Sequence, residues 1–155
     1  MLATLSLSAV VMAQQSLPPP SPDFVRGLQV MREDGNRTQT IESFALKAKT
    51  GDVDAVLAMF VPEARASEGD DEIRKYISKN IIPFFSAYEK LHNYSYIEPR
   101  TMPDGRTGYR YYTYFVNSQS GKTPFDIIIM EVNGMYLIAN FNARGCIKGK
   151  HPICD

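Results

Sequence analysis

The stretch PFDIIIMEVNGMYLIANFN, residues 124–142, decides the fold. Asn133-Gly134 is a favoured two-residue hairpin turn, and it lies between two runs that are rich in β-branched and aromatic residues. We therefore predict two antiparallel strands, over residues 124–132 and 135–142.

Pairing across this turn sorts the hairpin into two faces. Val132 should lie opposite Met135, and the remaining pairs follow residue by residue, with opposed residues on the same face. The first face comprises Phe125, Ile127, Ile129, Glu131, Tyr136, Ile138, Asn140 and Asn142. The second comprises Asp126, Ile128, Met130, Val132, Met135, Leu137, Ala139 and Phe141. Both faces are largely apolar, so both are expected to be buried.

The rest of the chain predicts helices first and strands afterwards. Helical spacing of apolar residues indicates helices over residues 38–50, over 52–60 with Asp52 as the N-cap, and from Asp70 or Asp71 onwards with a bend at Pro83. Alternating patterns indicate strands over 94–99 and 107–118, before the hairpin. This order predicts an α+β domain with N-terminal helices packed on a curved antiparallel sheet of about four strands.

The N-terminal residues suggest export. An uncharged apolar run from Leu2 to Met12 ends at Ala13, which is typical of a secretory signal peptide over 1–13, although a basic n-region is missing; a short buried helix is the alternative. Residues 14–35 begin with a proline-rich tract and are expected to form an extended leader. The folded domain is then 36–144, with a tail over 145–155, and the protein is periplasmic or secreted.

The tail carries both cysteines of the chain. In an exported protein, Cys146 and Cys154 would form a disulfide that ties down the tail. The alternative is a metal site that also uses His151 and Asp155, but its spacing matches no common zinc motif. We expect neither a metal nor a cofactor.

Charge and motifs remove several classes of function. The 17 basic and 17 acidic residues balance, so no basic surface for nucleic acid is indicated. The sequence contains no phosphate-binding loop, serine-hydrolase elbow or metal-binding histidine pair.

Several residues together resemble the nuclear transport factor 2-like superfamily, which includes SnoaL-like polyketide cyclases and ketosteroid isomerase-like proteins. The resemblance rests on Phe44-Ala45, Gly51-Asp52, Ala55, Phe60, Pro62, Asn133-Gly134 and Tyr136-x-Ile138, in that order. It implies a cone-shaped, cystatin-like fold in which the sheet wraps around a cavity roofed by the helices. It also implies that Tyr136, Asn140 and Asn142 point into that cavity, and that the sheet forms a dimer.

Tyrosines and asparagines supply the candidate ligand-binding residues. The full set is Tyr76, Tyr88, Tyr111 (or Tyr109), Phe125, Ile127, Tyr136, Asn140, Asn142 and Arg144. A buried asparagine needs hydrogen-bond partners, and either a polar ligand or local groups would provide them. Aromatic filling of the core is the alternative for each tyrosine.

Catalytic candidates are few. A proton-transfer enzyme needs a base with a tuned pKa, and His92 and Asp126 are the candidates, although Asp126 falls on the second face. The leading hypothesis is an exported binder of a small hydrophobic ligand. The alternatives are a cofactor-independent lyase or isomerase that acts on a hydrophobic carbonyl compound, and a ligand-free interaction module.

The second face of the hairpin needs a cover. A second copy of the chain is the expected partner, and the leader or the tail is the alternative cover. No stable membrane anchor is expected.

Overall fold

The helices precede the strands along the chain, and together they form an α+β fold. A computed structural model describes residues 19, 21–92, 96–117, 119 and 121–143, without the side chains of 23–33. The helices are α1 (Pro22–Lys49), α2 (Val53–Leu57), α3 (Pro62–Glu68), α4 (Asp70–Tyr76), the π-helix η1 (Ile77–Ile81) and α5 (Ile82–Phe85). The strands are β1 (Tyr88–Leu91), β2 (Tyr96–Thr101), β3 (Thr107–Asn117), β4 (Gly121–Val132) and β5 (Met135–Asn142).

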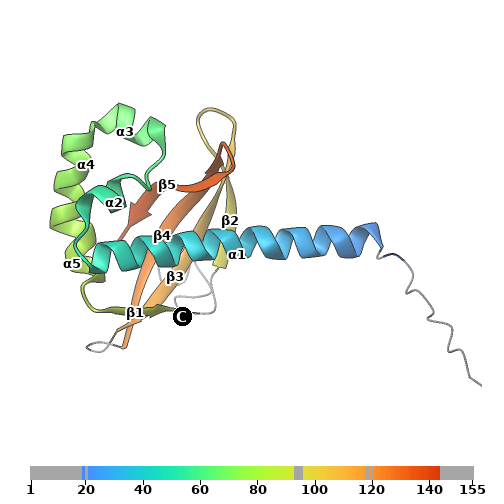
Figure 1. Cartoon of the computed structure of the whole chain (residues 1–155), viewed down its shortest axis with the longest axis horizontal. Coiled ribbons are helices and arrows are strands. Elements are labelled where there is room, and N and C mark those ends of the chain that lie inside the picture. The colour runs from blue at the N-terminus through green and yellow to red at the C-terminus, as the bar shows by residue number, and fades with distance from the viewer. Residues whose placement is uncertain (1–18, 20, 93–95, 118, 120, 144–155) are drawn as a thin grey trace, which may run out of the picture.

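The five strands form one strongly curled antiparallel sheet, which confirms the predicted fold class (Figure 1). Strand β3 pairs with β4 on one side and with both β1 and β2 on the other, while β5 lies at the end of the sheet beyond β4. Helix α1 crosses one face of the sheet, and it contacts α2, α5, β1 and β5. The shorter helices lie together beside the β5 end (Figure 1).

The helix boundaries differ from the sequence prediction at three places. Helix α1 begins at Pro22 instead of residue 38. Proline is well suited to the first turn of a helix, and no further proline interrupts the helix before Lys49. Pro62 likewise starts α3, which was not predicted, although Asp52 caps α2 as expected by accepting a hydrogen bond from the Ala55 amide at 2.9 Å. The predicted third helix changes to a π-helix over Ile77–Ile81, before the expected bend at Pro83.

The strands follow the prediction more closely, with one omission. Strand β1 was missed because Tyr88 continued the apolar spacing of the preceding helix, although the chain is already extended there. The hairpin between β4 and β5 turns at Asn133 and Gly134, both with positive φ (52° and 79°), as this turn type requires.

The predicted pairing of β4 with β5 holds near the turn and is wrong beyond Ile138. Val132 pairs with Met135 and Ile129 with Ile138, but Ile128 pairs with Asn140, so Ala139 is an extra residue in β5. This β-bulge exchanges the two faces for the end of the strand. Asn140 and Asn142 leave the helix-covered face, and Phe141 enters it.

Aromatic rings fill the inside of the curled sheet. Phe85, which is fully buried, lies 5.9 Å from Phe44, 5.3 Å from Phe115 and 5.5 Å from Phe141, measured between ring centroids. Phe125 is also fully buried, at 5.5 Å from Phe85. These edge-to-face and tilted contacts make the interior of the cone a packed core.

A polar cluster attaches α1 to β3 at the other end of this core. The Tyr111 hydroxyl donates to Asp34 Oδ1 at 2.6 Å and accepts from Arg37 Nε at 2.8 Å. Arg37 is only 6% exposed, and its guanidinium lies 4.0 Å from the centre of the Tyr109 ring. Burial, followed by the hydrogen bond to Asp34, raises the pKa of Tyr111 well above its ordinary value.

We predict that Tyr111→Phe lowers the free energy of unfolding at neutral pH by about 1–3 kcal/mol, because Arg37 then loses a buried hydrogen-bond partner. The pKa of Tyr111 is higher in the folded state than in the unfolded state, so its neutral phenol stabilises the fold. This stabilisation is complete below pH 10.0, the ordinary pKa of tyrosine, and is lost as the pH rises further. Urea unfolding between pH 7 and 11 measures both effects. The difference between wild type and variant should shrink in alkali, and a constant difference would contradict this account.

Candidate functional site

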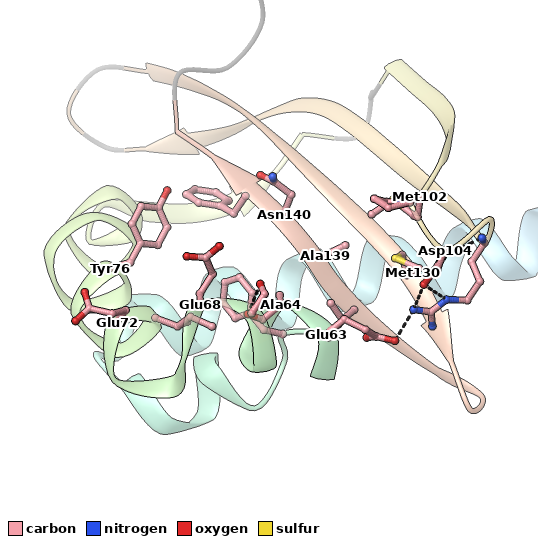
Figure 2. Close-up of a pocket in the computed structure, with 17 residues that line it drawn as sticks. Glu63, Ala64, Glu68, Glu72, Tyr76, Met102, Asp104, Met130, Ala139 and Asn140 are labelled. Carbon is pink, nitrogen blue, oxygen red and sulfur yellow. Dashed lines mark hydrogen bonds and ion pairs between the residues drawn. The ribbon is translucent and has the colours of Figure 1, made fainter.

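A pocket of about 710 Å³ lies between the short helices and strand β5, outside the aromatic core (Figure 2). Helices α3 and α4 form one side, the tip of the β2–β3 hairpin forms another, and β4 and β5 form the floor. The lining residues are Phe60, Val61, Glu63, Ala64, Ser67, Glu68, Glu72, Ile73, Tyr76, Met102, Pro103, Asp104, Arg106, Met130, Ala139, Asn140 and Phe141.

The bulge in β5 sets part of this floor. Ala139, the extra residue, and Asn140, which follows it, both line the pocket. On the edge of β5 that faces away from β4, Ile138 forms hydrogen bonds with the chain segment that leads into α3. Its N–H donates to the Met59 carbonyl at 2.8 Å, and its carbonyl accepts from the Val61 N–H at 2.9 Å. The strand therefore positions the start of α3 directly beside the pocket.

Ion pairs join the hairpin tip to α3 at one end of the pocket. Arg106 donates to Glu63 Oε1 at 2.5 Å and, through Nε, to Asp104 Oδ2 at 2.8 Å (Figure 2). The hydrogen bond from Arg106 lowers the pKa of Asp104 below its ordinary value. Met102 accepts the Gly105 amide at 2.9 Å, which closes the expected turn at this tip.

Acidic side chains without an arginine line the other end. Glu68 and Glu72 come from α3 and α4, and the Glu68 carboxylate lies between Tyr76 and strand β5 (Figure 2). A hydrogen bond from Lys75 lowers the pKa of Glu72. The lining thus contains four carboxylates and one guanidinium, above a floor that is mainly apolar. Such a surface suits a ligand with an apolar body and a positive charge.

Gly108 on β3 is closely packed beside the floor of the pocket. A side chain there would begin 3.0 Å from Ile128 Cγ2, 3.2 Å from Met130 Cγ and 3.3 Å from Met102 Sδ. Two of these neighbours, Met102 and Met130, line the pocket. The missing Cβ of Gly108 therefore lets both methionines settle against the sheet.

Tyr76 and Asn140 are the predicted ligand-binding residues that the structure brings together at this pocket, as Figure 2 shows. The others lie elsewhere: Tyr88, Phe125 and Ile127 are buried in the core, Tyr111 belongs to the cluster with Asp34, Tyr136 packs half-buried against the core, and Asn142 pairs with Asp126 in the strand register. Arg144, Cys146, Cys154, His151, Asp155 and the signal segment 1–13 lie outside the described residues.

The two catalytic candidates also lie away from the pocket. The His92 ring stacks on Tyr114 at 4.1 Å, and its backbone N–H donates to the Tyr114 carbonyl at 3.0 Å. Asp126 is 2% exposed on the second face, as predicted, and accepts from Arg110 Nε at 3.0 Å. Neither residue lines the pocket.

Sequence reasoning missed the acidic part of the site. Glu63, Glu68 and Glu72 belong to a polar stretch that looks like an ordinary solvated surface, and Asp104 and Arg106 belong to a turn. The sequence carries no signal that the stretch and the turn meet, because the ion pair between Glu63 and Arg106 spans 43 positions. Within the described part of the chain, no group of acidic, histidine or cysteine side chains is arranged to hold a metal ion.

Comparisons of this chain with known proteins found no match. No family model, no curated protein and no solved structure matches it. Among the described residues, no helix is both long enough and apolar enough to cross a membrane.

We predict that Gly108→Val lowers the free energy of unfolding by about 1–3 kcal/mol, because the new methyl groups overlap Ile128 and the two pocket methionines. Thermal or urea unfolding measures the loss. Gly35→Ala is the matched control: Gly35 lies in α1 with open space around it, and alanine should stabilise the helix by up to about 1 kcal/mol. Equal effects of the two substitutions would show that Gly108 is not closely packed.

Proposed function

We propose that this protein binds small ligands that combine an apolar body with a positive charge, and that they occupy the pocket between α3, α4 and β5. The observation that carries the proposal is the combination of an apolar floor with an acidic rim. The acidic rim consists of Glu63, Glu68, Glu72 and Asp104. The volume of about 710 Å³ falls in the range of small-molecule sites, roughly 300–1,000 Å³. The ligand site is therefore proposed beside the cone, whose interior is occupied by phenylalanines.

Binding without chemical change is the function that these groups favour. A general base at neutral pH needs a pKa near the working pH, whereas the pKa values of Asp104 and Glu72 are lowered. A lyase or isomerase that uses His92 or Asp126 would have to act at another place, since neither residue lines the pocket.

Two wider expectations stay proposals. The order of helices and strands supports membership of the nuclear transport factor 2-like superfamily, and the apolar run over residues 2–12 supports export. Binding of a ligand in the pocket depends on neither of them.

A pair of ligands with one apolar body tests the charge preference. We expect 1-naphthylmethylamine to bind at least about tenfold more tightly than 1-naphthylacetate at low salt, because the pocket carries an excess of carboxylates. Naphthyl fluorescence measures binding directly, since the chain has no tryptophan. Glu68→Lys should weaken binding of the amine about two- to tenfold, in keeping with one or two exposed charge interactions.

Glu89→Lys is the matched control, because Glu89 is an exposed carboxylate on β1 that does not line the pocket. It should leave binding of the amine unchanged. Equal affinity for both naphthyl ligands, or equal effects of the two lysine substitutions, would rule out the proposed site.

The homodimer also stays a prediction, now centred on the tip of the β4–β5 hairpin. Met135 is 57% exposed there, and Val132 and Leu137 beside it are half-buried, whereas Met130 is already buried within the single chain. We expect sedimentation to give a dimer for wild type and a monomer for Met135→Glu, because the glutamate would be desolvated at the interface. Leu46→Glu, at an exposed apolar position on α1, should leave the dimer intact. A monomeric wild type would contradict the prediction.

A further inference from the structure

Strand β5 has an edge beside the pocket that no other strand of the described residues pairs with. It is the last strand of the sheet, and β4 pairs with one of its sides. On the other side, residues 59–61 bond to Ile138 and then turn away, because Pro62 begins α3. An unpaired strand edge offers backbone N–H and C=O groups to another extended chain.

The alternation of the ladder identifies the open backbone groups. Ile138 directs its N–H and C=O away from β4, since both bond to residues 59–61. Ile138 lies opposite Ile129, so the neighbouring Ile128 faces β5, Ile127 faces away, and Asp126 faces β5 again. Phe141, which lies opposite Ile127, therefore directs its N–H and C=O to the outer edge. Within the described residues, no backbone group outside the sheet bonds to it there.

This edge is part of the pocket wall. Phe141 lines the pocket together with Ala139 and Asn140 of β5 and with Ile73 and Tyr76 of α4. The side chain of Phe141 is turned into the core, where its ring lies 5.5 Å from Phe85, so the backbone is what the residue presents to the edge. A ligand in the pocket thus meets a hydrogen-bond donor and an acceptor spaced as in a strand.

The side-chain chemistry around the edge matches one kind of occupant. Consecutive side chains of an extended peptide point in opposite directions. Beside β5, the pocket floor at Met130 and Ala139 is apolar, and the carboxylate of Glu68 lies between Tyr76 and the strand. A segment in which apolar and basic residues alternate satisfies both surfaces.

We propose that the natural ligand is an extended peptide segment with alternating apolar and basic residues, which adds a strand to β5 at Phe141. The inference rests on the proposed function, because it assigns a class of ligand to the same pocket. The backbone bonds to Phe141 provide affinity that is independent of sequence, and the floor and the acidic rim select the side chains.

Alternating N-methylation tests the strand pairing. The probe is the blocked peptide acetyl-Val-Lys-Val-Lys-Val-amide, in three forms: unmodified, N-methylated at the valines, and N-methylated at the lysines. Only every second N–H of an added strand faces β5, so we expect one methylated form to lose at least about tenfold in affinity and the other to keep it. Calorimetry or competition with 1-naphthylmethylamine measures binding.

Backbone hydrogen exchange gives a second readout at a single residue. The unmodified peptide should slow exchange of the Phe141 amide, whereas 1-naphthylmethylamine should not. The Tyr136 amide is the matched control, because it faces the same edge by the same alternation but lies outside the pocket. Its exchange should be unchanged by either ligand.

The outcomes separate this inference from the proposed function. If both methylated peptides bind equally, or if the amine binds and no peptide does, strand addition is overturned while the pocket remains a binding site. If neither the peptides nor the amine bind, the proposed function fails and the inference fails with it. Loss of affinity in one methylated form, with slower exchange at Phe141, supports both.

Discussion

One extra residue in β5 determines how the end of the sheet meets the helices. At Ala139 the strand gains a residue relative to β4, and every side chain beyond it changes face. Phe141 consequently enters the core, where its ring lies 5.7 Å from Phe44 and 5.5 Å from Phe84. Without the bulge, an asparagine would occupy a site surrounded by phenylalanines and would lack hydrogen-bond partners, at a cost of about 1–3 kcal/mol.

The same residue connects the core to the pocket. A bulge increases the local twist of a strand, so the end of β5 turns relative to its beginning. Ile138, just before the bulge, anchors residues 59–61 and thereby the start of α3. Asn140, just after it, becomes part of the pocket floor. Packing inside the sheet and recognition outside it therefore depend on one local irregularity.

The parts of the fold that follow from local sequence could be predicted. Asn133-Gly134 specifies its turn by backbone preference, Asp52 caps its helix, and the hairpin pairs correctly as far as Ile138. The bulge could not be predicted, because Ala139 fits a regular strand equally well and the choice depends on which ring the core accepts. For the site, Tyr76 and Asn140 were anticipated for a different reason, as members of a cavity inside the cone. The acidic rim depends on contacts between distant segments, which no local pattern encodes.

The ion pair between Arg106 and Glu63 lies at the wall of the pocket and is open to solvent. It is the ion pair that joins the β2–β3 hairpin tip to α3, and its side chains are 36% and 55% exposed. Contacts of this kind weaken as salt rises, since the screening length falls from about 10 Å at 0.1 M to about 3 Å at 1 M. At this point the hairpin tip and α3 are joined by an ion pair that is exposed to solvent. This contact between the two sides of the pocket is therefore expected to weaken at high ionic strength.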